Sequence, residues 1–429
     1  MAFKPIQKLV VSRTLSSGRK LAIGILAQNR QGVFFQYDQE YLNSFENLSP
    51  FAIQLDTSVQ QAPKVPHGGL HGVFADALPD GWGLLLQDRV FRQHGILPAS
   101  ITAMDRLAFV GNSAMGALSF SPTSDYMEKS DEEISLDKLG LNAQAIFDGQ
   151  TEDVLAELIA AGSSGGARPK AQVYFSGDNP NLCRTTPKPN DEAWLVKFTS
   201  ANFALGHEES LCEAAYLTLA ERAGLKPPTW TLLNAPKRSG AEKWLALKRF
   251  DYVNNPDGTS GRLHLHSACG LLDADFRSPS LDYDDLIKAT RILCKSPVAG
   301  QLQFKRAIFN LLVCNQDDHS KNWAFLQNDD GQWQPAPFYD VTYSPHPFGE
   351  HATSFAGFGK HPPLKALQKL AESAGFARWP IAVQVIKELI EIVSDFNEVA
   401  AKLGVKRQST CLIAEQLRNS AIAINKTLS

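Results

Sequence analysis

The feature of this 429-residue sequence that most constrains its fold is a change in hydrophobic spacing along the chain. Up to about Ser121, short apolar runs bounded by turn signals predict strands. Residues 165–250 mix strand patterns with a helical pattern at 208–222, which ends at Gly224. From about residue 280 helical spacing dominates, as in the stripe Ile381, Val385, Ile386, Leu389, Ile392 and Val393. We therefore expect an α+β protein with a strand-rich N-terminal subdomain, a small mixed α/β lobe and a larger all-helical lobe.

These changes predict three domains, at residues 1–124, 125–255 and 256–429. The stretch from Asp125 to Glu157 holds ten acidic residues and only two lysines. A charge run of this kind is typical of a solvated face or of a linker. We expect it to be the linker ahead of the mixed lobe.

Composition excludes several classes of protein. With 42 Lys and Arg against 45 Asp and Glu, the net charge is −3, so the chain is not built to coat nucleic acid or an anionic membrane. No apolar run approaches the roughly 18 residues of a membrane-spanning helix, and charged residues interrupt the N-terminus, which argues against a secretory signal. Six scattered cysteines without a CxxC pair predict reduced thiols in a cytoplasmic protein rather than disulfides.

The densest polar cluster, residues 315–322, reads NQDDHSKN and follows an apolar run. The spacing Asp317-x4-Asn322 matches a phosphotransferase catalytic loop, in which Asp accepts the proton of the attacking hydroxyl and Asn reaches a magnesium ion. Eighteen residues later, Asp340 follows an aromatic pair and could join the metal to phosphates, since Mg²⁺ takes few oxygen ligands from protein.

These acidic residues also have simpler explanations. Asp317 and Asp318 could form an Asx-turn after a helix, and Asp340 could be structural. His319 could be a zinc ligand, although no second ligand stands at helical spacing from it.

A second signal is the small-residue loop Ser163-Ser164-Gly165-Gly166-Ala167-Arg168-Pro169-Lys170. Backbone N–H groups of such a loop can approach phosphate oxygens, and Arg168 or Lys170 could add positive charge. The loop is neither a Walker A motif nor GxGxxG, and a flexible turn is the alternative.

A third signal is Lys197, inside the apolar run 194–198. A lysine there needs a partner or a ligand, and Glu213 on the following helix could pair with it, as in kinases. The alternative is an edge-strand lysine that reaches solvent. Glycine loop, strand lysine, helix glutamate, Asp-x4-Asn loop and later aspartate follow one another in the order found in kinases.

In this combination the chain resembles the HipA family of bacterial toxin kinases. The resemblance rests on motifs that run from about Val33 to Ser344 and more loosely to the C-terminus. The carrying motifs are GGARPKA (165–171), WLVKF (194–198), the helix at 209–225, LKRFD (247–251), NQDDHSKN (315–322) and PFYD (337–340), with FADALPDGWG (74–83) and AFVGNSAMGAL (108–118) nearer the N-terminus.

The resemblance implies a two-lobed serine/threonine protein kinase that uses ATP and Mg²⁺. Asp317 would be the catalytic base, and Asn322 and Asp340 would be the Mg²⁺ ligands. Lys248 to Phe250 would form the hinge around the adenine. The residues implied at the nucleotide are Gly165, Gly166, Ala167, Arg168, Lys170, Lys197, Glu213, Lys248, Phe250, His319 and Tyr339.

The resemblance also implies a cellular role. Family members switch themselves off by phosphorylating a serine at the phosphate loop, which corresponds here to Ser163 or Ser164. A phosphate there would repel the nucleotide phosphates. The implied partners are a small helix-turn-helix antitoxin (HipB-like) and a target such as an aminoacyl-tRNA synthetase, with DNA reached only through the antitoxin and no membrane involved.

Two alternatives stay open from the sequence. The chain could be a scaffold that docks a DNA-binding antitoxin with little or no catalysis. It could also be a kinase of a small molecule or lipid, since the Asp-x4-Asn loop is shared with such enzymes. An intact set of Lys197, Asp317, Asn322 and Asp340 favours an enzyme, whereas Pro169 removes one N–H from the loop.

Overall fold

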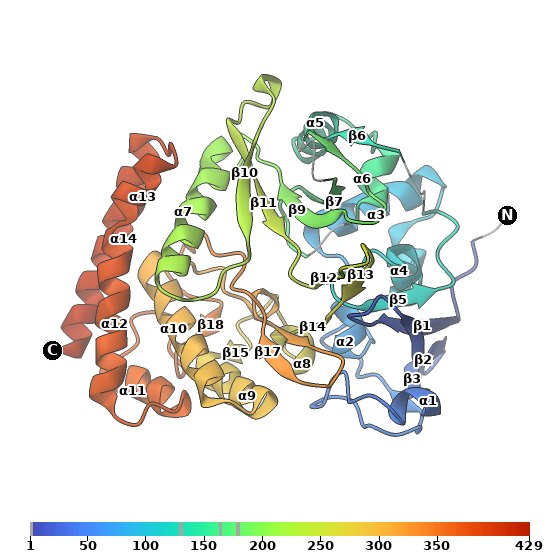
Figure 1. Ribbon diagram of the computed structural model, residues 1–429, viewed down its shortest axis with the longest axis horizontal. Helices are drawn as coiled ribbons and strands as arrows, with labels where there is room; N and C mark the ends of the chain where they lie inside the picture. Colours follow the sequence, from blue (N-terminus) through green and yellow to red (C-terminus); the bar gives the residue numbers. More distant parts are fainter. Residues whose placement is uncertain (1–2, 128–131, 163–164, 177–180) are drawn as a thin grey trace.

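The fold has three parts (Figure 1). Residues from all three line one cleft. The computed structural model describes residues 3–127, 132–162, 165–176 and 181–429. The blue N-terminal sheet lies at one end of the molecule and the red C-terminal helices lie at the other. A second sheet with its own helices lies between them.

The N-terminal part is a five-stranded antiparallel sheet with the strand order β4-β3-β2-β1-β5. Alternate strand residues such as Leu9 and Val11 are buried, and they pack with Met104 and Leu107 of helix α4. Its elements are β1 (Lys8–Thr14), β2 (Lys20–Asn29), β3 (Gly32–Tyr37), α1 (Gln39–Leu42), β4 (Gln60–Gln61), α2 (Gly72–Ala75), α3 (Gly81–Gln93), α4 (Ala103–Val110) and β5 (Leu118–Ser121).

The middle part is a four-stranded antiparallel sheet with the order β10-β11-β9-β7. Helix α7 (Glu209–Arg222), which the sequence predicts at 208–222, packs against strands β10 and β11. The other elements are α5 (Leu136–Phe147), α6 (Ala156–Ala160), β7 (Lys170–Phe175), β9 (Glu192–Lys197), β10 (Trp230–Asn234) and β11 (Lys243–Lys248), with the short pairs β6 (Ile134–Ser135) with β8 (Leu182–Cys183) and β12 (Tyr252–Asn254) with β13 (Ser260–Arg262).

The prediction of a linker at 125–157 is wrong for its second half, because helix α5 belongs to the core of the middle part. Leu139 and Ala143 of this helix are fully buried in the same cluster as Trp244. The acidic side chains Glu132, Asp137 and Asp153 are exposed. The charge run is therefore the solvated face of a packed segment.

The C-terminal part is mainly helical, but it is not all-helical as expected. Strand β14 (His264–Ser267) pairs with β16 (Ala324–Gln327), and β16 pairs with β17 (Trp333–Pro335). A further two-residue parallel pair joins β15 (Leu281–Asp282) to β18 (Thr353–Ser354). These runs of two to four residues are too short to show a strand period in the sequence.

The helices of this part surround the largest apolar core. In α12, Ile386, Leu389 and Val393 are buried as the predicted stripe requires, whereas Ile381 is exposed. No helix in the described ranges is both long and apolar enough to cross a membrane. The helices are α8 (Ala268–Leu271), α9 (Tyr283–Cys294), α10 (Pro297–Val313), α11 (Leu364–Ser373), α12 (Trp379–Ser394), α13 (Phe396–Lys402) and α14 (Arg407–Leu428).

Candidate active site

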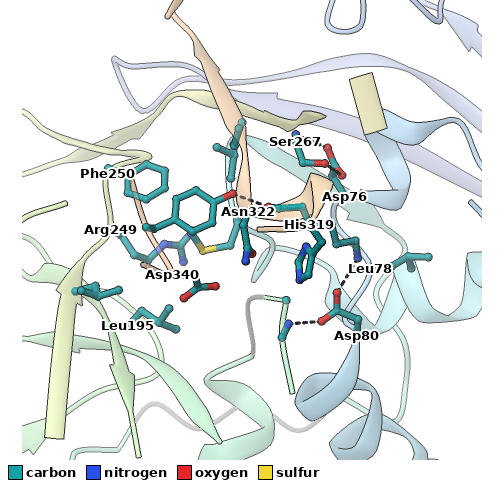
Figure 2. A pocket seen from close by; sticks show the side chains of 18 of the residues that line it. Asp76, Leu78, Asp80, Leu195, Arg249, Phe250, Ser267, His319, Asn322 and Asp340 are labelled. Carbon is teal, nitrogen blue, oxygen red and sulfur yellow. Dashed lines mark hydrogen bonds and ion pairs between the residues drawn. The ribbon is translucent and has the colours of Figure 1, made fainter. Parts of the chain in front are cut away.

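Eight of the site residues predicted from the sequence line a cleft between the three parts. It encloses about 940 Å³, including space that is open to solvent. Figure 2 shows Asp340, Asn322 and His319 near its centre and Asp76 and Asp80 on the side of the N-terminal part. The predicted residues that line it are Gly165, Gly166, Lys248, Phe250, His319, Asn322, Tyr339 and Asp340.

The Asp-x4-Asn loop is fixed at both sides by the chain around it. Helix α10 ends at Cys314, whose positive φ of 54° turns the chain out of the helix. The N–H of Gln316 donates to Ser344 O at 3.2 Å, and the N–H of Asp317 donates to Ser344 Oγ at 3.3 Å. The segment after Asp340 therefore sets where Asp317 is presented.

Asp317 lies at the open face of this loop. Its side chain is 71% exposed, and the nearest cation partner is His319, whose Nε2 lies 3.8 Å from Asp317 Oδ1. Partial loss of water in the cleft raises the pKa of Asp317 above its ordinary value; His319 opposes this rise and the Asp340 carboxylate adds to it. Asp317 is thus an accessible carboxylate with a raised proton affinity.

Asp318 lies on the opposite face of the loop and is fully buried. Its carboxylate accepts hydrogen bonds from the Tyr283 hydroxyl and the Thr353 N–H, and its Oδ2 lies 2.8 Å from His351 Nδ1. Its carbonyl oxygen accepts from Thr353 Oγ1 at 2.6 Å and from Trp323 Nε1 at 3.2 Å. Asp318 therefore anchors the loop to the core.

Asn322 and Asp340 offer oxygen donors of the kind that Mg²⁺ prefers. Asn322 Nδ2 donates to Asp317 O at 2.7 Å, so the amide oxygen remains as a metal donor. Asp340 stands at a positive φ of 51°, a strained backbone state for a residue other than glycine that is typical of functional sites. In the described residues, no group of three or more His, Cys, Asp and Glu side chains is arranged to hold a metal ion. The donor set fits a Mg²⁺ that takes its other ligands from phosphate and water.

The predicted pairing of Lys197 with Glu213 is confirmed. Lys197 Nζ donates to Glu213 Oε1 at 2.6 Å, and it also contacts Asp340 Oδ1. Burial alone would lower the pKa of Lys197, but the carboxylates of Asp340 and Glu213 raise it. Burial would likewise raise the pKa of Asp340, but Lys197 and Lys170 hold it well below its usual range. Strand β9, helix α7 and the segment after β17 thus bring the side chains of Lys197, Glu213 and Asp340 into contact.

The phosphate loop is only partly turned toward the cleft. Gly165 and Gly166 line the cleft, and Lys170 Nζ donates to Gly165 O at 2.6 Å across the base of the loop. Arg168 instead forms an ion pair with Glu209 of helix α7 at 2.8 Å. The predicted phosphorylation sites Ser163 and Ser164 lie outside the described residues.

The far end of the cleft is apolar and aromatic. The Phe250 and Tyr339 rings stack with their centroids 5.7 Å apart and an angle of 23° between them. Leu195 and Leu247 lie on the opposing sheet, and Lys248 pairs with Glu192 at the rim. A flat heteroaromatic ring would find apolar walls here, as the predicted hinge requires.

Two family profiles match the chain. The HipA N-terminal domain matches residues 18–121, and the HipA-like C-terminal domain matches residues 162–418, more than half of the chain. The chain belongs to the HipA family. The resemblance inferred from the glycine loop, the catalytic loop and the Phe-Tyr-Asp motif is confirmed.

Curated relatives of this HipA-family chain align with parts of it. The serine/threonine-protein kinase toxin HipA of Shewanella oneidensis is 26% identical over 197 residues, 42% of each chain. In Sinorhizobium fredii, Y4mE is 30% identical over 114 residues (25% of this chain, 26% of Y4mE), and Y4dM is 27% identical over 188 residues (41% and 44%). Their names mark both as candidate kinases. The chain spans less than half the length of each of these relatives.

A solved structure confirms the predicted HipA-like α+β fold. It is the Shewanella oneidensis MR-1 toxin–antitoxin system HipA, HipB and its operator DNA complex. The TM-score is 0.68 at 17% sequence identity, and the match covers 98% of this chain and 97% of that chain. This likeness concerns the fold alone.

Sequence reasoning missed the part of the HipA-family site that comes from the N-terminal subdomain. Asp76 and Asp80 line the cleft together with Ser267 and Lys321. Lys321 Nζ donates to Asp80 Oδ2 at 2.8 Å. The one local signal is that both aspartates stand in the family motif FADALPDGWG, ahead of a helix.

A Ser-His-Asp arrangement behind the cleft does not make this HipA-family protein a hydrolase. Ser49 Oγ lies 2.9 Å from His266 Nε2, and His266 Nδ1 lies 2.7 Å from Asp76 Oδ2, which is the geometry of a nucleophilic triad. Both Ser49 and His266 are fully buried, so no substrate can reach the hydroxyl. The arrangement joins the N-terminal part to strand β14.

Proposed function

We propose that this chain is a serine/threonine protein kinase that uses ATP and Mg²⁺. The observation that carries the proposal is the contact of Lys197 with both Glu213 and Asp340, beside the loop that holds Asp317 and Asn322. Kinases need this lysine–glutamate pair and a metal-binding aspartate together. Membership of the HipA family and the kinase names of the relatives support the same reading.

The nucleotide would lie with its base between the Phe250–Tyr339 stack and the leucines of the sheet. Its phosphates would lie near Gly165, Gly166 and Lys197. Asn322 and Asp340 would hold Mg²⁺, which supplies charge neutralisation for the phosphates. Lys197 would add a fixed positive charge that is already desolvated and oriented by Glu213.

Asp317 would orient the acceptor hydroxyl and take its proton. Its exposure lets a protein side chain approach, and its raised pKa brings it closer to the range where a general base is effective. Pairing through Asn322 fixes the Asp317 carbonyl, so the carboxylate is the part of the residue that remains free to act.

In the cell, we propose that the chain is the toxin of a toxin–antitoxin pair and acts in the cytoplasm. A HipB-like antitoxin would be its partner, because the solved relative with the same fold is described with HipB and operator DNA. A net charge of −3 favours contact with DNA through that antitoxin. A translation component such as an aminoacyl-tRNA synthetase is the proposed target, and Ser163 or Ser164 the proposed site of self-inactivation.

The test is the intact mass of the purified protein before and after incubation with Mg-ATP, followed by peptide mapping. We expect one added phosphoryl group on Ser163 or Ser164, absent from Asp317→Ala. Unmodified protein that binds ATP without gaining phosphate would point to a small-molecule or lipid acceptor. Protein that does not bind ATP would leave the scaffold as the better explanation.

A further inference from the structure

The start of helix α3, in the N-terminal part, forms hydrogen bonds with the proposed phosphate loop (residues 165–170) of the middle part. Trp82 donates twice to this loop, from its N–H to Gly166 O at 3.0 Å and from its indole Nε1 to Lys170 O at 2.9 Å. The Gly166 N–H in turn donates to Asp80 Oδ1. Three hydrogen bonds therefore fix the loop from one side.

Gly81 allows this close approach. Its φ is +40°, and a Cβ built there would lie only 2.7 Å from Ala167 Cα and from Gly166 O. No other residue fits without moving the backbone of the loop. The spacing between helix α3 and the loop is therefore set by backbone contact and does not depend on a flexible side chain.

Asp80 also reaches the catalytic loop. Lys321 Nζ donates to Asp80 Oδ2 at 2.8 Å (Figure 2). The Asp80 side chain is 12% exposed and the Lys321 side chain is 18% exposed. Lys321 is itself held, because its Nζ lies 4.2 Å from the centroid of the Phe276 ring and its carbonyl oxygen accepts from the Tyr339 hydroxyl at 2.7 Å. One carboxylate thus joins the glycine loop to the loop of Asp317.

The charge on Asp80 suits this role. Burial alone would raise its pKa, but the Lys321 ammonium and the Gly166 N–H lower it below the ordinary value. The carboxylate is therefore ionised at neutral pH, and both of its oxygens have a partner.

We propose that Asp80 is a positioning residue for phosphotransfer: through Gly166 and Lys321 it holds the phosphate loop at a fixed place over the catalytic loop. The inference rests on the proposed kinase function. A displacement of about 1 Å between reacting groups can lower a rate about 10²-fold, so a tie between the loop that receives the phosphates and the loop that presents Asp317 affects the rate directly.

An opposite reading makes a different prediction. The Asp80 carboxylate could occupy the place of a nucleotide phosphate on the Gly166 N–H and the Lys321 ammonium. Removing its charge would then strengthen ATP binding, whereas a positioning role leaves ATP affinity close to that of the wild type and lowers kcat.

The experiment compares Asp80→Asn, Asp80→Ala, Lys321→Met and Asp80→Asn with Lys321→Met in the full chain. Asp88→Asn is the matched control. Asp88 lies on helix α3, which begins directly after Asp80 in the chain. Its side chain is 20% exposed and pairs with Arg106 at 2.7 Å, and neither Asp88 nor Arg106 lines the cleft. The measurements are kcat, KM and Kd for ATP, the melting temperature, and hydrogen exchange of the segment 165–170.

We expect kcat to fall by about 10- to 100-fold in each single variant, with the double variant no worse than the worse single one. Exchange at 165–170 should rise in Asp80→Ala, while Asp88→Asn keeps wild-type kcat and exchange. Wild-type kcat in a folded Asp80→Asn, tighter ATP binding, equal losses in Asp88→Asn, or additive losses in the double variant would each overturn the proposal.

The outcome separates this inference from the proposed function. If the wild type transfers no phosphate, the kinase assignment has failed, and hydrogen exchange still shows whether Asp80 holds the loop. If the wild type is active and exchange at 165–170 is the same in Asp80→Ala as in wild type, Asp80 does not hold this loop in place. The kinase assignment then still stands.

Discussion

The two faces of the loop at residues 315–322, the proposed catalytic loop, differ completely although two adjacent aspartates form them. On the front, the Asp317 side chain is 71% exposed, and among the described residues its ion-pair partner is His319, at 3.8 Å. On the back, Asp318 is fully buried among Tyr283, His351 and Thr353. The same residue type thus meets solvent on one face and a packed hydrogen-bond network on the other.

This difference shows how a segment without regular secondary structure can hold an exposed carboxylate in a fixed place. Buried polar networks hold their members in one geometry because each unmade hydrogen bond is costly away from water. Asp318 makes the buried hydrogen bonds that hold the loop in place, so the carboxylate of Asp317 has no structural role. The prediction from this comparison is that mutations on the two faces separate activity from stability.

The largest effect should follow replacement of the front carboxylate. In Asp317→Asn, phosphotransfer should fall about 10²- to 10⁴-fold, the contribution typical of a general base. The free energy of unfolding should change by less than about 0.5 kcal/mol, because the side chain is exposed. Quantified self-phosphorylation and urea unfolding of the same preparation test both statements. A variant that phosphorylates at the wild-type rate would show that Asp317 is not the base.

The reciprocal change on the back should chiefly affect stability. Asp318→Ala leaves the partners at Tyr283, His351 and Thr353 unsatisfied in the core and should lower the free energy of unfolding by about 3 kcal/mol. Asp318→Asn, which keeps the shape, should lower it less. Urea unfolding, with Asp317→Asn as the control, measures the difference. If the two positions prove equally tolerant, the division of the loop into two faces is wrong.

Lys197 extends the comparison, since one of its partners is buried and the other faces the cleft. Glu213→Gln should lower the free energy of unfolding by about 1.5 kcal/mol because a neutral amide replaces the buried carboxylate that pairs with Lys197. Asp340→Asn should leave the stability closer to that of the wild type and remove the Mg²⁺ dependence of ATP binding. Calorimetric titration of ATP with and without Mg²⁺ separates the two, and the same Mg²⁺ response in Asp340→Asn and wild type would contradict its role as a ligand.

The pH dependence should report the front face. Because the pKa of Asp317 is raised, the unprotonated base is lost at a higher pH than for an ordinary aspartate. The acid limb of kcat/KM should therefore lie above about pH 3.9, the ordinary value for aspartate. A profile of kcat/KM from acid to neutral pH, with unfolding followed at each pH, tests this. A limb at or below the ordinary value would mean that Asp317 does not carry the proton.

Local spacing was enough to find several groups that the structure brings together in the candidate site. The Asp317-x4-Asn322 spacing, the lysine in an apolar strand and the glutamate one helix later each carry their own signal, and the structure joins Lys197 to Glu213 at 2.6 Å. The α+β fold followed from hydrophobic spacing and the family resemblance. The short strands around the 315–322 loop were missed, because two to four residues show no hydrophobic period. The charge run predicts a linker where helix α5 lies, because the charged exposed residues of this helix conceal the pattern of its buried ones.

Contacts between distant segments left no such signal. Asp80 precedes its partner Lys321 by 241 residues, and its other partner is a backbone N–H, which any residue could supply. Likewise, the spacing to Asn322 singles out Asp317, but nothing in the sequence places Asp318 in the core. Its burial arises from His351 and Thr353, which the fold brings back to the loop. The ion pair between Arg168 and Glu209 also left no signal in the sequence.

The smallest predicted effect concerns His319, whose ring lies close to the front carboxylate. The charge of His319 lowers the pKa of Asp317. Replacing it in His319→Gln removes that charge, so the acid limb of kcat/KM should move to higher pH. Because His319 also lines the cleft, its replacement can change the maximum value of kcat/KM. Only the pH at which kcat/KM falls on the acid side tests the prediction. A limb that stays in place, or moves to lower pH, would mean that the 3.8 Å contact does not persist in solution. The Asp317 carboxylate would then interact even less with neighbouring side chains than the comparison with Asp318 implies.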